Sequence, residues 1–170
     1  LCDSFFTARA EYALTGSHSV EDAFLENYAR PASFPHLPDG MVPMCYPADH
    51  FNGNYIANWA LWLILEVYEY RQRGGDPQLI AALENRIRGI LDFLSHYENG
   101  EGLLEDVPGW VFVEWSRAND LTAGVNYPSN MIYSAALRAA GVLYRDSDLL
   151  AKGRRLCETI RASSFDGLWF

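Results

Sequence analysis

The sequence predicts an all-α protein built from helical hairpins, and two observations support this fold class. Three segments are apolar on nearly every side, which is typical of helices buried all round. Three others carry a single apolar stripe at helical spacing, which is typical of helices that face water on one side. Each apolar segment precedes an amphipathic one, and the pairs are residues 2–15 with 20–29, 55–73 with 78–97, and 130–144 with 149–162.

The pairs form an internal repeat. Leu79 and Leu149 have equivalent places in the second and third amphipathic segments and lie 70 positions apart. Repeats of this kind bury their apolar faces by stacking one hairpin on the next. We therefore expect two layers, with the apolar helices inside and the amphipathic helices outside.

The first hairpin has boundaries that follow from turn chemistry. Gly16 ends the apolar helix, and Ser19 is placed to cap the following helix together with Asp22. Pro31 ends that second helix, because proline cannot continue a helical hydrogen-bond ladder. The apolar side chains of the first helix, Tyr12 among them, are expected to be buried nearly all round.

The second and third hairpins are marked in the same way. Asp76 is a helix N-cap and Pro77 takes the first helical position, so one continuous helix is predicted over residues 78–97. A polar turn over residues 145–148 separates the last two helices. No regular helix is expected over residues 32–54, because this loop contains four prolines and two glycines.

Composition excludes several classes of protein. The 170 residues are 49% hydrophobic, which suits one domain with a core. A net charge of −9 argues against a nucleic-acid partner, since such proteins gather Lys and Arg. The longest apolar run, residues 56–67, is too short to span a bilayer. Cys2, Cys45 and Cys157 are widely spaced, so reduced thiols and a cytoplasmic location are favoured.

The two long loops, residues 32–54 and 98–129, hold most of the unusual chemistry. Both precede an inner helix, whereas the short turns follow one, so both loops are expected at the same end of the stack. Asp3, at the start of the first inner helix, belongs to that end as well. The sequence therefore predicts one cleft, surrounded by Asp3 and the two loops, as a binding site.

Residues 109–133 are the richest part of these loops, with Trp110 and Trp115 on either side of several apolar residues. Aromatic rings combined with carboxylates suit a carbohydrate ligand, and glycosidic cleavage needs two carboxyl groups. The candidate carboxylates are Asp3, Asp49, Glu105, Asp106, Glu114 and Asp120. Glu114 is the sharpest candidate, because its apolar neighbours suggest partial burial and a shifted pKa. The alternative is a loop carboxylate paired with Arg117 or a helix N-terminus.

Other chemistry is poorly supported. The sequence lacks a dinucleotide-binding glycine motif, a P-loop, a nucleophile elbow and a zinc-protease motif. The four histidines are scattered, so neither a metal site nor a cofactor is expected. His50 fits a hydrogen-bonding loop residue better than a catalyst, and Trp62 fits the core better than the site.

Four stretches resemble bacterial α-L-rhamnosidases of glycoside hydrolase family seventy-eight. They are DGMVPMCYPADH, YIANWALWLILEVYEY, GWVFVEWSRAND and VNYPSNMIYSAAL, and the resemblance covers most of the chain. It implies the central part of a six-hairpin (α/α)6 barrel, with residues 1–170 as one barrel segment. It also implies hydrolysis of terminal α-L-rhamnosyl residues by an inverting mechanism without a cofactor.

The resemblance also assigns roles to residues. Cys2-Asp3 looks like a pair in which Asp3 binds the sugar, while Trp59 matches an aromatic wall of the pocket. Asn58, beside Trp59, is a further substrate-binding candidate. Glu114-Trp115 looks like an acidic–aromatic pair that lines the pocket, which makes Glu114 a substrate-binding group. Asp49 and His50 are kept as further substrate-binding candidates.

The resemblance places the general acid before Leu1 and the general base after Phe170. The isolated chain is then expected to be inactive, with exposed inner helices that the rest of the barrel or a second copy covers. Two alternatives remain: a non-catalytic helical-hairpin module that binds a sugar or a protein, and another (α/α) barrel glycosidase or lyase.

Overall fold

A computed structural model describes residues 1–48 and 53–168, and within these ranges the fold is all-helical, as predicted. Isolated bridges are the only β-type pairings among the described residues. The elements in chain order are α1 (Cys2–Thr15), α2 (Ser19–Ala29), α3 (Ala57–Gln72), α4 (Pro77–Ala82), α5 (Glu84–Ser95), the 3-10 helix η1 (Arg117–Leu121), α6 (Tyr127–Leu143) and α7 (Ser147–Ser164).

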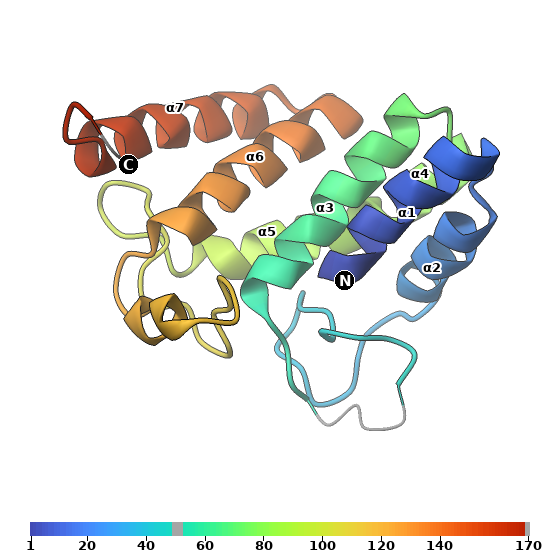
Figure 1. The fold of residues 1–170 in the computed structure, drawn as a ribbon, viewed down its shortest axis with the longest axis horizontal. Helices are drawn as coiled ribbons and strands as arrows, with labels where there is room; N and C mark the ends of the chain where they lie inside the picture. Colours follow the sequence, from blue (N-terminus) through green and yellow to red (C-terminus); the bar gives the residue numbers. More distant parts are fainter. Residues whose placement is uncertain (49–52, 169–170) are drawn as a thin grey trace.

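The helices form the expected hairpins. Helices α1, α3 and α6 lie side by side toward the viewer in Figure 1, with α4 and α5 behind them and α7 along α6. The pairs α1–α3, α3–α6 and α6–α7 are in direct contact. This arrangement confirms the all-α class, whereas closure of such hairpins into a six-hairpin barrel stays a prediction.

The core is centred on α3 and α6, which contribute most of the fully buried side chains. Leu63, Ile64 and Tyr133 have no measurable exposure. Helices α6 and α7 approach closely at Gly153, where an added Cβ would lie 2.9 Å from the carbonyl oxygen of Ser134. A glycine is therefore required at position 153 for this helix–helix contact.

Helix α1 has the predicted bounds but not the predicted burial. Phe5 and Ala8 are buried, whereas Phe6, Tyr12 and Leu14 are exposed. The prediction that α1 is buried nearly all round, Tyr12 included, is wrong. The reason is that α1 packs mainly against α2 and α3, so the side chains on its opposite face stay at the surface.

The backbone N–H groups at the N-terminus of α2 have a different hydrogen-bond acceptor from the one predicted. Ser19 does not cap the helix, and the N-cap residue is His18, whose side chain makes no capping hydrogen bond. Instead, the Glu11 carboxylate accepts hydrogen bonds from the backbone N–H groups of Val20 at 2.9 Å and Glu21 at 3.2 Å. A carboxylate from the preceding helix thus replaces the local cap and lowers the pKa of Glu11.

The outer helix of the second hairpin is divided in two. Asp76 caps α4 as predicted, accepting from the Gln78 N–H at 2.8 Å, and Pro77 is at its start. The predicted single helix over residues 78–97 is interrupted at Leu83, where ψ is −8°. Leu83 is fully buried, so the interruption turns an apolar side chain into the core. The Asn126 side chain likewise caps α6, and that of Asp146 caps α7.

The two ends of the helical stack differ, as expected. The short turns lie at one end, and the long segments, residues 30–48 with 53–56 and residues 96–126, lie at the other, below the helices in Figure 1. We call these the turn end and the loop end. Met41 and Val42 are buried and fasten the first loop to the core. No helix among the described residues is both long and apolar enough to cross a membrane.

Candidate functional site at the loop end

The two long loops meet beside the N-terminus of α3. The Trp110 N–H donates to the Tyr55 carbonyl at 3.4 Å, and Ile56 pairs with Trp110 as an isolated bridge. Gly109 has φ of +84°, and an added Cβ would lie 2.7 Å from the Tyr55 ring. Only glycine therefore lets the second loop pass this close to the first. The predicted position of both loops at one end is confirmed, whereas a single cleft that they form with Asp3 stays a prediction.

Four aromatic side chains gather where the loops meet, and we call Trp59, Trp110, Phe112 and Trp115 the aromatic cluster. Phe112 is its centre, with its ring centroid 5.8 Å from Trp59, 5.3 Å from Trp110 and 4.8 Å from Trp115. All these contacts are edge-on, which is a favoured geometry for aromatic pairs. Trp115 is nevertheless 81% exposed, so most of its surface is free to contact a ligand.

Asp3 lies at the same end of the helical layer as this cluster. Helices α1 and α3 run in the same direction, since Phe6 contacts Trp62 at 5.8 Å and, further along both helices, Arg9 bonds Glu69 at 2.7 Å. Asp3 lies three positions before Phe6, and Trp59 lies three positions before Trp62. Residues three apart share a helix face, so both lie one turn closer to the loop end. The Asp3 side chain is exposed and makes no hydrogen bond or ion pair within the described residues.

Glu114 does not lie where the sequence suggested. Its side chain is exposed, so the predicted partial burial is wrong. Val111 and Val113 are only half-buried and Trp115 is exposed, so these apolar residues cannot enclose the carboxylate. Within residues 1–48 and 53–168, Glu114 pairs neither with Arg117 nor with a helix N-terminus, which leaves its oxygens available to a ligand.

Asn58 is in the interior rather than on the surface. Its Nδ2 donates to Ser129 Oγ at 2.7 Å, and that hydroxyl donates to Asn126 Oδ1 at 2.5 Å. Asn58 Oδ1 is buried without a partner beside a cavity of about 10 Å³. A cavity of this size holds one water molecule and no sugar. Asn58 therefore supports the N-terminus of α6, and it does not line an open pocket.

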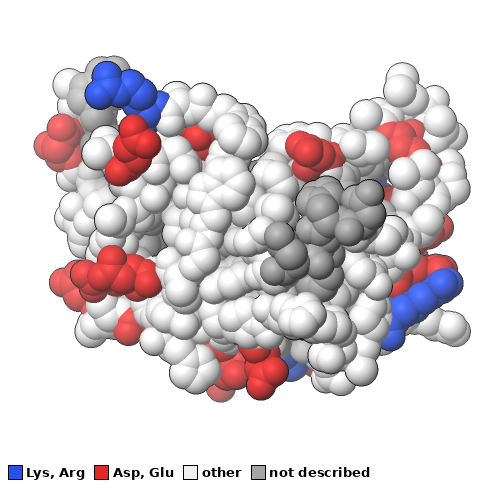
Figure 2. Space-filling view, turned by 90° about the horizontal axis from the view of Figure 1, so that it is seen from below, with Lys and Arg blue, Asp and Glu red and all other residues white. Residues whose placement is uncertain are grey.

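The remaining candidates are dispersed. Asp49 and His50 lie outside the described residues. Glu105 and Asp106 are exposed, and both stabilise their own loop: Glu105 accepts from Asn99 at 3.1 Å, and Asp106 accepts from the Gly124 N–H at 2.8 Å. Asp120 is exposed in η1. Among the described residues, the loop end thus presents Asp3, Glu114 and Asp120 as unpaired predicted carboxylates. Figure 2 shows acidic side chains mostly around the margin of this face.

Sequence reasoning overlooked one buried carboxyl group. Glu66, in the middle of α3, has no exposed surface, and burial raises its pKa to about 8 despite a 2.7 Å hydrogen bond from Ser4 Oγ. Its Oε1 has no partner. The available signal was a single glutamate inside the run LWLILEVY, whose other members are all apolar. The carboxyl group lies at the α1–α3 contact and does not reach the aromatic cluster.

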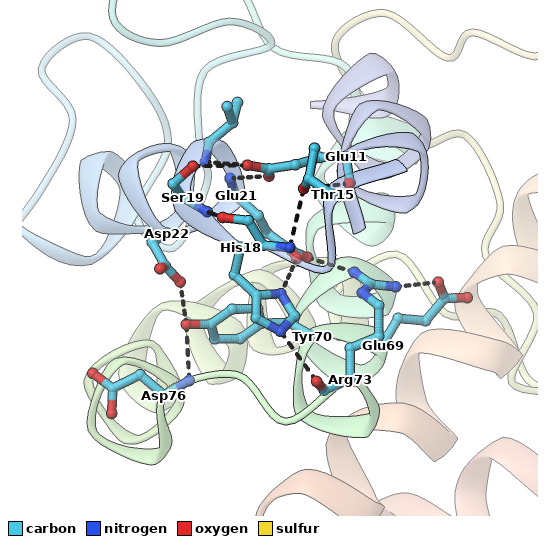
Figure 3. Close-up of polar contacts among 12 residues, drawn as sticks. Glu11, Thr15, His18, Ser19, Glu21, Asp22, Glu69, Tyr70, Arg73 and Asp76 are labelled. Carbon is cyan, nitrogen blue, oxygen red and sulfur yellow. Dashed lines mark hydrogen bonds and ion pairs between the residues drawn. The ribbon is translucent and has the colours of Figure 1, made fainter. Parts of the chain in front are cut away.

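A second polar cluster occupies the turn end, and its members bond to one another (Figure 3). Arg73 donates to Glu21 at 2.6 Å and to Glu69 at 3.0 Å, while His18 lies 3.3 Å from Glu21. Tyr70 donates to Asp22. Burial raises the pKa of Glu21 although Arg73 opposes the shift, whereas hydrogen bonding to Arg9 lowers the pKa of Glu69. This network ties α1, α2 and α3 together, and we assign it to stability.

Metal chemistry finds no support in the geometry. Among the described residues, no three His, Cys, Asp or Glu side chains gather closely enough to hold an ion. The three cysteines are half-buried, and none forms a disulfide within the described residues. Comparison of the chain with protein families, with curated proteins and with solved structures finds no match. The function is therefore argued from the loop end itself.

Proposed function

We propose that the loop end is a sugar-binding surface of a glycoside hydrolase that resembles the α-L-rhamnosidases. The observation that carries this proposal is the exposed aromatic cluster, which lies at the same end as two unpaired carboxylates. Trp115 offers a broad apolar surface to the C–H face of a sugar. Asp3 and Glu114 offer acceptors for its hydroxyl groups.

The residues serve binding in this proposal, and they do not perform the chemistry. Glycoside hydrolysis needs one carboxyl group on each side of the scissile bond, and inversion needs room between them for a water molecule. Asp3, Trp59, Glu114 and Trp115 instead hold the terminal α-L-rhamnosyl unit, without a cofactor. The complete enzyme would supply the acid and base from other hairpins, so the isolated chain binds the sugar without cleaving its glycosides.

Isothermal titration of the 170-residue chain with L-rhamnose tests the proposal. We expect weak binding, and at least about a fivefold loss in both Asp3→Ala and Trp115→Ala, since each removes one side of the surface. Leu14→Ala is the matched control, because Leu14 is an exposed apolar residue at the turn end. The proposal fails if all four proteins bind equally, or if a folded chain binds no rhamnose.

A further inference from the structure

An apolar groove runs along the exposed face of α6, away from the aromatic cluster. On its α7 side the groove is a hollow of about 560 Å³ with Met131, Cys157 and Ile160 among its walls. On its α3 side it continues as a hollow of about 510 Å³ that reaches Phe6, Trp62 and Val142. The two hollows share Ala135 and Arg138, so they form one continuous surface that we call the α6 groove.

The groove exposes large apolar side chains. Phe6 is 52% exposed, Met131 40% and Val142 42%, and all three belong to its walls or floor. Met131 and Val142 mark the extent of the groove along α6. Eleven helical residues rise about 16 Å, which matches about three turns of another helix laid against them.

The charges around the groove are opposite to those of the protein as a whole. The chain has 13 Lys and Arg against 22 Asp and Glu. Most cationic side chains are bonded within the fold, but Arg138, Arg154 and Arg161 make no hydrogen bond or ion pair within the described residues, and all three line the groove. Glu69, the acidic residue among these lining residues, is already paired with Arg9 and Arg73.

We propose that the α6 groove is a docking surface for an amphipathic α-helix of a partner polypeptide, with an apolar stripe flanked by Asp or Glu. The apolar floor receives the stripe, as in other helix-in-groove complexes. The unpaired guanidinium groups, one on α6 and two on α7, meet carboxylates of the docked helix. This inference is independent of sugar binding, since none of these groove residues belongs to the aromatic cluster.

The charge pattern favours a partner helix over a second copy of this chain. A two-fold symmetric dimer would place the same groove on both subunits. The unpaired arginines of one copy would then face those of the other, and like charges at an interface disfavour association. An acidic helix removes that conflict and supplies each guanidinium with a partner.

A model peptide tests the proposal directly. The probe is an 18-residue helical peptide with Leu at positions i, i+4, i+7 and i+11 and Glu on both flanks, labelled for fluorescence anisotropy. We expect it to bind the chain saturably and more weakly as salt rises. The same peptide with Lys in place of Glu should bind at least about tenfold more weakly.

Protein variants locate the binding. Arg138→Glu combined with Arg161→Glu should weaken binding of the Glu peptide at least about tenfold, since both side chains line the groove. Arg155→Glu is the control, because Arg155 is exposed on α7, like Arg161, but lines neither hollow. This variant should change peptide binding less than about twofold. Trp115→Ala, which tests the sugar surface, should leave peptide binding unchanged.

Three results would overturn the inference. The first is no saturable binding of the Glu peptide to the wild-type chain, and the second is equal affinity for the Glu and Lys peptides. The third is a dimer in sedimentation equilibrium that Arg138→Glu alters, because it would assign the groove to a second copy. The charge-reversed peptide needs no protein variant, so the inference stays testable even if the double variant does not fold.

Discussion

The polar side chains at the two ends of the helical stack have opposite environments. At the turn end, Glu21 and Arg73 are largely withdrawn from water and bonded within a network that joins three helices. At the loop end, Asp3, Glu114 and Trp115 are exposed, and the two carboxylates have no partner among the described residues. Groups whose bonds are satisfied inside the protein stabilise it, whereas unsatisfied exposed groups remain available to a ligand. The difference assigns stability to one end and binding to the other.

The largest effect is expected from breaking the turn-end network. Arg73→Ala leaves the Glu21 carboxylate buried without its cationic partner, so we expect a loss of roughly 3 to 5 kcal/mol in the free energy of unfolding near neutral pH. The loss should be smaller near pH 5, because burial favours a protonated Glu21. Arg30→Ala, which removes the exposed ion pair with Glu26, should cost less than about 1 kcal/mol. Equal costs for the two variants in urea denaturation would contradict the assignment.

Glu66, between the two ends, predicts how stability depends on pH. Its pKa is about 8 in the folded state and 4.5 for an ordinary glutamate, so the folded state binds the proton more tightly. This group's contribution is therefore complete below about pH 4.5 and is lost as pH rises through about 8. A shift from 4.5 to about 8, at about 1.4 kcal/mol per unit of pKa, makes the loss on the order of 5 kcal/mol.

Glu66→Gln isolates that contribution. We expect the variant to match the wild type near pH 5 and to be more stable at pH 9, as measured by thermal denaturation. Glu69→Gln is the control of opposite sign, because the Arg9 hydrogen bond lowers the pKa of Glu69. Its stabilising contribution is present above the ordinary glutamate pKa and is lost on acidification. Parallel pH profiles for wild type and Glu66→Gln would count against a buried protonated Glu66.

A smaller difference in the free energy of unfolding is expected between substitutions of two asparagines near the starts of α3 and α6. Asn130 makes three side-chain hydrogen bonds: it accepts from the Leu104 N–H at 2.7 Å and donates to the carbonyls of Leu104 and Asn126, each at 3.0 Å. Asn58 makes one, to Ser129. Asn130→Ala should therefore cost about 2 to 3 kcal/mol and Asn58→Ala about 1 kcal/mol in denaturant unfolding. The reverse order would mean that Asn58 Oδ1 has a strong partner, such as a water molecule in its cavity.

Local signals in the sequence predicted much of the fold. The apolar and amphipathic periods located the helices, and Asp76-Pro77 marked the start of α4, because both features depend on residues close in sequence. The meeting of the long loops at one end followed from the repeat. The place of Trp115 at the loop end could be predicted, because a long loop in a compact domain is usually either functional or disordered and this one is rich in aromatic residues.

The wrong predictions concern features that depend on contacts between residues far apart in the sequence. Tyr12 stays exposed although its ring stacks on His18, because an apolar pattern does not reveal which neighbours are present. Glu114 is exposed because its loop lies on the surface, although its neighbours are apolar. Glu11 caps α2 in place of Ser19 through a contact that sequence spacing does not show. The burial of Glu66 likewise depends on the packing of α1 against α3.

The most direct test of the division between the two ends is a two-dimensional ¹H–¹⁵N spectrum of the tryptophan indole N–H groups during titration with L-rhamnose. The account predicts shifts for Trp110 and Trp115 that saturate together, with Trp62 much less affected because it packs against Phe5 and Phe6. Assignments come from single Trp→Phe variants. If rhamnose moves Trp62 most, or leaves every indole signal in place, the loop end is not the sugar-binding surface.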